Sequence, residues 1–439
     1  MHKSLKTIAL TLLFAAILMP ATAQVYFPHE NNVQFNDFFE DATLRINYFR
    51  EGCQKGNKVI LSQMLKKNST WAGSTTQMID PINNGVYRIV VVDAASGINL
   101  YSRCYNTLFR EYCDTPEGKD SVVRFEEVMN VPFPKQPVEI LFQERDENQQ
   151  FYTQLSASFD PAKSVNSNIK SSNDPLRLLY NGDPHNKIDV VIVAEGYGPK
   201  DKKKMTADFA KFTEYLLDKE PFRSRTNDFN VWGIDKLGDA SGITNPGKNL
   251  KVNSAIGATY YTFGSARYLM CFNLFKLHDL LDNVPFDHII IMANSDTYGG
   301  GAIYNFYAVS AVQSMSSYIL PHELGHSIGG LADEYVDQEI SYSDMHLPTQ
   351  EPLEYNITSL VNFEIKWKDM LNPTTPVPTP PCKLSHRMDT CGELGVYEGG
   401  GYQPKGIYRP VMNCMMNYYA PFCPVCTKVL NAVFDLYTK

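Results

Sequence analysis

The stretch HELGHSIGGLADEY, from His322 to Tyr335, is the part of this 439-residue chain that decides how its C-terminal half must fold. It opens with the pattern H-E-x-x-H, formed by His322, Glu323 and His326. On an α-helix, positions i and i+4 lie on one face, about 6 Å apart. Both imidazoles can then reach one zinc ion at about 2 Å, and the Glu323 carboxylate can meet a metal-bound water. The spacing therefore predicts a helix that presents a zinc-binding pair.

The ends of this helix can be predicted from its flanking residues. Pro321 is acceptable in a first helical turn, so the helix is expected to begin between Ser316 and Pro321. Gly329 and Gly330 predict its end, because glycine is preferred just past a helix. A chance H-E-x-x-H would occur roughly 0.01 times in such a chain, so the context favours a real metal site. Catalytic zinc usually takes three protein ligands, so a third must come from beyond the turn.

Length and composition limit the classes of protein. The chain is 44% hydrophobic and 20% charged, which is typical of a folded globular protein of two or three domains. Its formal net charge of −8 argues against a nucleic-acid or anionic-membrane partner, since both favour a basic face.

The N-terminal segment MHKSLKTIALTLLFAAILMPATAQ has the organisation of an export signal. Lys3 and Lys6 precede an apolar run over residues 8–19 that is too short to cross a bilayer. Ala21-Thr22-Ala23 then matches a cleavage site, so residues 1–23 are predicted to be a signal peptide. The alternative is a membrane anchor. We expect an exported chain (periplasmic, cell-surface or extracellular) with no transmembrane segment after cleavage.

Residues 24–160 are predicted to form an N-terminal β-sandwich domain. Short β-branched or alternating runs recur there, separated by polar, Gly- or Pro-containing segments. They are TLRINYF from Thr43, KVILSQML from Lys58, VYRIVVVD from Val86, VEILFQE from Val138 and FYTQLSASF from Phe151. Residues 161–185 are rich in Ser, Asn, Asp and Pro, which is the composition of a linker.

From residue 186 to 439 the pattern becomes that of a second, larger domain. Buried-strand runs begin at Lys187, Asp228 and Phe286, and helical patterns begin near residue 201 and at Tyr268. GAIYNFYAVSA, residues 301–311, alternates like a strand with one exposed side. Strands that alternate with helices predict an α/β domain with a mixed, mostly parallel sheet. The whole chain is therefore of the α+β class.

The zinc motif resembles that of the metzincin metallopeptidases, H-E-x-x-H-x-x-G-x-x-H. Here the position of the third histidine is Ala332, which cannot bind metal. The full stretch is similar to the motif of the IgA peptidase family, the igalysins, which ends in G-L-x-D-E-Y. That resemblance makes Gly330 the helix-ending glycine and Asp333 the third zinc ligand, with Glu334 and a more distant glutamate as alternatives. It also implies a metzincin-like catalytic domain.

A second resemblance lies downstream, in CMMNY, Cys414 to Tyr418. Metzincins have a Met-turn beneath the zinc, and the resemblance assigns Met416 to it. It also makes Tyr418 a candidate for hydrogen bonding to the zinc-bound water or the reacting carbonyl. Met412 and Met415 are competing candidates, and both assigned residues could instead be ordinary core residues. The similarity to igalysins covers about residues 180–439, and their N-terminal β domain corresponds to residues 24–160.

Five of the nine cysteines lie in the last sixty residues. FCPVC contains a C-x-x-C pair, Cys423 and Cys426, which is a weak signal for a redox pair or a metal half-site. Disulfides from this pair to Cys382, Cys391 or Cys414 are favoured in an exported protein.

Together these features predict a secreted zinc-dependent endopeptidase that cleaves extracellular proteins or glycoproteins, immunoglobulin A-like or mucin-like proteins among them. Glu323 would be the general base, and an extended substrate would pair with the strand over residues 301–311. One alternative is a zinc-stabilised protein- or glycan-binding protein with an inactive peptidase-like domain. Hydrolysis of a non-peptide bond is another. The N-terminal domain could be an inhibitory prodomain or a binding module.

Overall fold

The N-terminal part of the chain folds into two four-stranded sheets. The computed structural model describes residues 33–169, 174–336, 346–381 and 393–438, so the predicted signal peptide lies outside it. One sheet has the order β5-β1-β2-β8, made of Val123–Pro134, Phe39–Cys53, Gly56–Lys66 and Val165–Asn166. The other has the order β4-β3-β6-β7, made of Asn99–Tyr105, Tyr87–Asp93, Val138–Arg145 and Phe151–Phe159. Apolar side chains of both sheets share one core, for example Ile46, Ile89 and Phe142.

The five runs predicted as strands lie in β1, β2, β3, β6 and β7, but β4 and β5 were not predicted. β5 contains two adjacent glutamates, Glu126 and Glu127, and two prolines, Pro132 and Pro134, all of residue types that strands disfavour. Tertiary pairing with β1 overrides these local preferences. Two short helices, α1 (Phe35–Phe38) and α2 (Leu108–Cys113), also belong to this part.

The second part is built on a six-stranded sheet of order β13-β14-β12-β10-β11-β9. Its strands are Gly300–Ile303, Tyr307–Ala311, His288–Ala293, Ile188–Glu195, Phe229–Ile234 and Leu176–Leu179. The four inner strands run parallel, and the two outer strands pair antiparallel with them. The prediction of a mixed, mostly parallel sheet is therefore confirmed. β9 lies within the segment predicted as a linker, because its leucines join the edge of this sheet.

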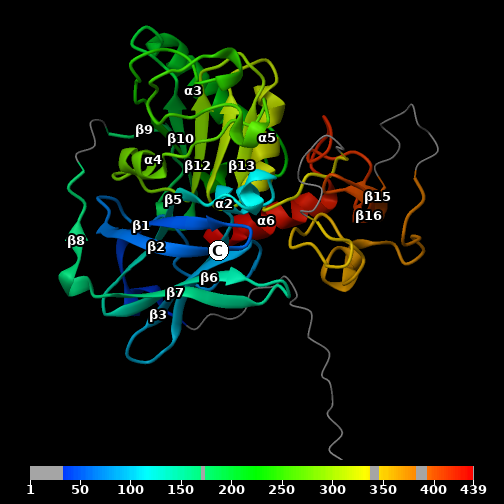
Figure 1. Ribbon diagram of the computed structural model, residues 1–439, viewed down its shortest axis with the longest axis horizontal. Coiled ribbons are helices and arrows are strands. Elements are labelled where there is room, and N and C mark those ends of the chain that lie inside the picture. The colour runs from blue at the N-terminus through cyan, green and yellow to red at the C-terminus, as the bar shows by residue number, and fades with distance from the viewer. Residues whose placement is uncertain (1–32, 170–173, 337–345, 382–392, 439) are drawn as a thin grey trace, which may run out of the picture.

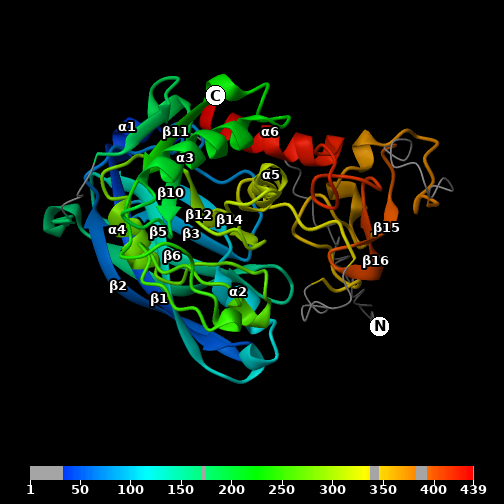
Figure 2. The same ribbon diagram turned by 90° about the horizontal axis from the view of Figure 1, so that it is seen from above.

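Helices cover both faces of the sheet (Figures 1 and 2). On one face α3 (Lys202–Leu217), α5 (Ser316–Ser327) and α6 (Pro424–Thr438) share a core with inward-facing residues of β10 and β12. On the other face α4 (Leu274–Leu280) packs against the alternate residues of the same strands. Phe209, Phe212 and Leu216 of α3 are buried against this face of the sheet.

Two predicted elements differ from the structure. The helix expected from Tyr268 is shorter and begins only at Leu274, because Tyr268 and Met270 form β-bridges to other segments. The strand expected over residues 301–311 is a hairpin of β13 and β14. Asn305 turns the chain between them with a φ of 51°, which asparagine tolerates better than most residues.

The remaining described residues form the small β15–β16 hairpin (Tyr397–Gly400 and Gln403–Arg409) and several 3-10 turns. The hairpin lies beside one end of α6, away from the two N-terminal sheets (Figure 1). The turns are η1 Glu117–Lys119, η2 Pro161–Lys163, η3 Pro184–Asn186, η4 Thr226–Asp228, η5 Pro246–Lys248, η6 Thr262–Gly264, η7 Phe363–Ile365 and η8 Lys368–Met370. Over the described ranges, no helix combines the length and apolar character needed to cross a membrane.

Candidate active site

The H-E-x-x-H motif lies on α5, which begins at Ser316, the early end of the predicted range. Pro321 therefore lies inside the helix, not in its first turn. The helix ends at Ser327, and Gly330 reverses the chain with a left-handed φ of 57°. The Gly330 N–H donates to the carbonyl of His326 at 2.9 Å. The two predicted glycines thus direct the chain back over the last turn of α5.

Three side chains converge where the returning chain passes the helix. Nε2 of His322 and Nε2 of His326 are 3.2 Å apart. Oδ1 of Asp333 lies 3.1 Å from the first and 3.3 Å from the second. In a tetrahedral site with bonds of about 2 Å, ligand atoms are separated by about 3.3 Å. The structure therefore brings together the three residues predicted as zinc ligands in the spacing that such a site requires.

The hydrogen bonds of the two imidazoles leave their Nε2 lone pairs facing this common point. Nδ1 of His322 lies 3.0 Å from the Met415 carbonyl, and Nδ1 of His326 lies 2.6 Å from the Leu331 carbonyl. A carbonyl oxygen only accepts, so each Nδ1 carries a proton, and in the neutral form of each ring Nε2 is the nitrogen with the free lone pair. Asp333 Oδ1 is buried with no hydrogen-bond partner among the described residues. Three unshared lone pairs at one point fit a bound cation.

The ionisation of the cluster follows from the same arrangement. Burial lowers the pKa of His326, but the Asp333 carboxylate more than offsets it, and the pKa is raised to about 9. Burial raises the pKa of Asp333, yet His326 and His322 hold it well below its usual range. Without a metal ion, the cluster therefore holds protons that a cation would displace.

Glu323 lies beside the two histidines and is buried, with 9% of its surface exposed. Burial raises the pKa of its carboxyl, while His322 and His326 oppose that shift. The Glu323 carboxylate lies next to β13. If Gly300 of that strand carried a Cβ, this atom would be 2.9 Å from Glu323 Oε1. The opposing effects of burial and of the two histidines leave the pKa of this carboxyl above its ordinary value.

Asp333 and Glu334 have different surroundings although they are neighbours in the chain. Asp333 faces the histidines, whereas Glu334 is fully buried behind them, with its Oε1 2.9 Å from the amide of Asn356. The structure therefore places Asp333, and not its competitor, at the cluster.

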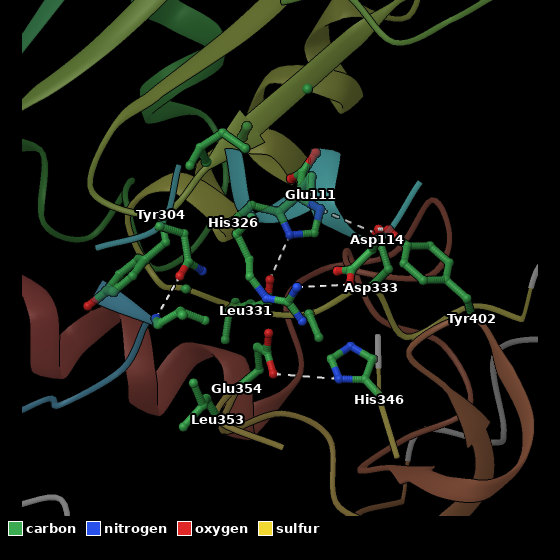
Figure 3. A pocket seen from close by; sticks show the side chains of 18 of the residues that line it. Glu111, Asp114, Tyr304, His326, Leu331, Asp333, His346, Leu353, Glu354 and Tyr402 are labelled. Atoms are coloured by element: carbon green, nitrogen blue, oxygen red, sulfur yellow. Dashed lines mark hydrogen bonds and ion pairs between the residues drawn. The ribbon is translucent and has the colours of Figure 1, made fainter. Parts of the chain in front are cut away.

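Tyr402 is a site residue that the sequence reasoning missed. Its hydroxyl donates to Asp333 Oδ2, and Figure 3 shows the two side chains pointing at each other. The backbone N–H of Gly401 also donates to the Asp333 carbonyl, at 2.8 Å. The turn of the β15–β16 hairpin therefore contacts both the side chain and the backbone of Asp333 and fixes its position. The signal in the sequence is the GGGY stretch, residues 399–402, because glycines allow one backbone segment to approach another closely.

Met416 packs directly beneath the helix between the two histidines. It is fully buried, and a Cβ at Gly325 would come within 2.4 Å of its sulfur. Its carbonyl accepts from the Glu334 N–H at 2.8 Å, and the carbonyl of Met415 is the one that orients His322. Tyr418 is 42% exposed on the wall of the same cleft, and no described contact joins it to the three converging residues.

The cluster opens into a cleft of about 1170 Å³ that both parts of the chain line. Glu111 of α2 reaches it from the N-terminal part and accepts a hydrogen bond from the Tyr268 hydroxyl. Burial raises the pKa of Glu111 to about 7. The side chain of Asn84 donates to the Gly330 carbonyl at 2.9 Å, so the N-terminal part also braces the chain reversal after α5. A cleft of this size exceeds most small-molecule pockets and suits a polymer.

A helix-borne histidine pair, a carboxylate partner and a buried glutamate lie together in one cleft, which is a set of side chains that could hold a metal ion in a hydrolase. Comparison with known families agrees. Residues 176–390 and 383–434 match the model of the IgA Peptidase M64 family, and residues 34–156 match the model of the Peptidase M64 N-terminus. The chain belongs to this family of peptidases, whose members are metallopeptidases acting on proteins. No curated protein matches the chain.

Proposed function

We propose that the protein is an exported, zinc-dependent endopeptidase that hydrolyses peptide bonds of extracellular proteins or glycoproteins. The observation that carries the proposal is the convergence of His322, His326 and Asp333 within 3.3 Å of one another at the floor of the cleft. These three residues would hold the zinc ion. Three protein ligands leave a fourth position open, which is the mark of a catalytic site.

The bound ion would supply Lewis-acid activation of the scissile carbonyl and lower the pKa of the attacking water to about 7. Glu323 would accept the proton of that water on its carboxylate and then pass it to the leaving amine. The hydrogen bonds from His322 and His326 to backbone carbonyls would keep both rings in their metal-binding tautomer. Tyr418 stays a candidate for stabilising the oxyanion, and the exposed Tyr298 on the same cleft is a second.

The substrate would extend along β13, which lies at the edge of the described sheet and runs over Glu323. Gly300 already exchanges hydrogen bonds with residues 267 and 269 at 3.3 Å. Backbone pairing with substrate is therefore expected beyond Gly300, at Ala302. Immunoglobulin A-like and mucin-like proteins are the substrate candidates that the resemblance suggests.

We also propose that the N-terminal part is a β-sandwich and a permanent wall of the cleft, and that the second part is metzincin-like. The shared core of the two small sheets and the position of Met416 support these assignments. Arg45–Asp279 and Tyr268–Glu111 contacts join the two parts, and residues of both parts line the cleft, as expected for a binding module that stays in place. This favours the binding-module interpretation.

The test is to load the purified mature chain with zinc and digest a mixed extracellular proteome. Glu323→Gln should keep its zinc and lose about 10²–10⁴-fold in cleavage rate, since it removes a general base. Glu364→Gln, at an exposed carboxylate that is not among the residues lining the cleft, is the matched control and should cleave like wild type.

The alternative, a zinc-stabilised binding protein, makes the opposite prediction. It requires that zinc-loaded wild type and Glu323→Gln show the same absence of cleavage while both bind a protein or glycan. That result would overturn the peptidase proposal.

A further inference from the structure

A second cluster of metal-ligand side chains lies directly behind the first. Glu334, Cys414, Cys423 and Cys426 each place one ligand atom within 4.8 Å of the others. All four are buried, with at most 5% of any residue exposed. We propose that this cluster binds a second zinc ion, or another soft divalent cation, as a closed structural site. It is independent of the catalytic proposal.

The distances within the cluster suit tetrahedral coordination by sulfur. Sγ of Cys414 and Sγ of Cys426 are 3.7 Å apart, and Sγ of Cys426 is 3.2 Å from Glu334 Oε1. Zinc–sulfur bonds of about 2.3 Å in a tetrahedron place two sulfurs about 3.8 Å apart. Three thiols with a carboxylate form a four-ligand set, and thiolate ligands select zinc and other soft metals.

A second observation points to a missing ligand for the carboxylate. Glu334 is fully buried, and its Oε2 has no hydrogen-bond partner among the described residues. A buried carboxylate oxygen without a partner is costly unless a cation satisfies it. The Glu334 side chain is turned toward the three sulfurs, where a cation would meet both its charge and its free oxygen.

Backbone N–H groups lie close to two of the three sulfurs. The N–H of Cys423 lies 3.3 Å from Sγ of Cys414, and the N–H of Cys426 lies 3.4 Å from Sγ of Cys423. Cys426 lies in the first turn of α6, and Cys423 immediately precedes that helix, where the helix dipole stabilises negative charge. These donors would support metal-bound sulfur.

The structure disfavours the disulfide interpretation for these cysteines. Cys414, Cys423 and Cys426 are all unbonded, and the 3.7 Å between two of the sulfurs far exceeds the roughly 2.05 Å of a disulfide. The predicted partners Cys382 and Cys391 lie outside the described residues. By itself, the C-x-x-C pair is a weak signal for a metal half-site. The fold brings Cys414 and Glu334 next to it, and these two residues complete a four-residue cluster.

A metal here would join three segments that the active site depends on. Glu334 follows Asp333, Cys414 precedes the Met415 carbonyl that orients His322, and α6 carries Cys426. The second site would therefore fix the segments that position a zinc ligand and the turn beneath it.

The experiment uses the full mature chain carrying His322→Ala and His326→Ala, which removes the first cluster without touching the second. After dialysis against metal-free buffer, this variant should retain one zinc ion per chain. Loaded with Co²⁺ instead, it should show an intense near-ultraviolet sulfur-to-cobalt band, which histidine and carboxylate ligands do not produce. Adding Cys423→Ser and Cys426→Ser should abolish both signals, whereas adding Cys113→Ala, at a buried cysteine outside the cluster, should preserve them.

A mercurial thiol reagent gives a readout that needs no cysteine substitution, in case the serine variant does not fold. It should release the one zinc ion from the double-histidine variant. The proposal is overturned if that variant retains no stoichiometric metal and gives no cobalt band. It is also overturned if alkylation of the unreduced, unfolded chain reveals a disulfide among the three cysteines. Neither result would bear on cleavage by wild type.

Discussion

The two side-chain clusters on either side of residues 333 and 334 differ in ligand type, in burial and in the number of ligand atoms. His322, His326 and Asp333 are 6–17% exposed at the floor of a cleft and offer three ligand atoms. The cluster of Glu334 with three cysteines is at most 5% exposed and offers four. Three ligands and an opening suit catalysis, whereas four ligands and no opening suit structure. The two proposed roles therefore differ in access and in ligand count as well as in ligand type.

The two clusters receive their carboxylates from neighbouring residues, Asp333 and Glu334. The Asp333 side chain faces the two histidines, whereas the Glu334 side chain faces the three cysteines, so these neighbours belong to different clusters. The Gly401 N–H holds the Asp333 carbonyl, and the Met416 carbonyl holds the Glu334 N–H. These two hydrogen bonds hold the backbone of residues 333 and 334 to the β15–β16 hairpin and to the segment around Met416.

The largest effects on metal binding are expected when Asp333 or Glu334 is replaced by the corresponding amide. Asp333→Asn removes a charged ligand, so the affinity of the histidine cluster for zinc and the cleavage rate should each fall by more than the roughly 10–100-fold typical of outer-shell changes. Glu334→Gln should weaken metal at the cysteine cluster and leave the first three ligands in place. Zinc titration of both variants, with proteolysis in parallel, measures this. Equal losses at the histidine cluster in both variants would contradict the division of roles.

The next largest effect is expected from pH, which should change the zinc affinity of the histidine cluster. In the metal-free chain the pKa of His326 is raised to about 9, so this ring is protonated at pH 7 and must lose its proton to bind metal. The apparent zinc affinity of the histidine cluster should therefore rise by about tenfold per pH unit between about pH 7 and 9, and flatten above. Competition with a chelator of known pH behaviour measures it. A flat profile below pH 9 would show that no proton is displaced.

Tyr402→Phe tests how the hairpin supports the histidine cluster alone. The variant keeps the ring contact with Tyr335, 5.3 Å between centroids, but loses the hydrogen bond to Asp333. Zinc affinity at this cluster should fall about 10–100-fold, as for other second-layer partners. Tyr397→Phe, whose hydroxyl donates to the Glu393 carbonyl in the same hairpin region, should not change it. Retained affinity with lost activity would instead place Tyr402 in the reaction itself.

Gly330→Ala should have the smallest effect on chemistry and act mainly on stability. Its left-handed φ costs about 1–3 kcal/mol for other residues, and a Cβ would also come within 2.3 Å of Asn84 Nδ2. Gly97→Ala has a φ of 75° and open space around it, so it isolates the backbone cost. Denaturant unfolding should show a larger loss for Gly330→Ala. Equal losses would mean that the Asn84 contact is unimportant.

Local pattern predicted those parts of the site whose geometry is set within a few residues. The i, i+4 spacing of His322 and His326 and the glycines that end α5 are of this kind, as are the buried runs of β10 and β12. The choice of Asp333 over Glu334 and the place of Met416 came from resemblance, and the structure brings both to the histidine helix. Their catalytic and structural roles stay predictions.

Other features depend on contacts between distant segments. Glu111 reaches the cleft from a six-residue helix that no periodic pattern marks. The helix expected from Tyr268 is cut short because its first residues pair with β13 and with residue 259. β5 forms in spite of unfavourable residues because β1 offers it a partner.

The amino-acid sequence by itself determined the helix that carries the histidine pair, its glycine stop and the alternation of strands and helices around it, because these follow from local spacing and backbone preference. Only the tertiary structure decided that Tyr402 braces Asp333 and that Glu334 joins three cysteines from about 80 to 92 residues away. Such meetings depend on how the sheet, α6 and the hairpin pack together. No spacing along the chain encodes that packing.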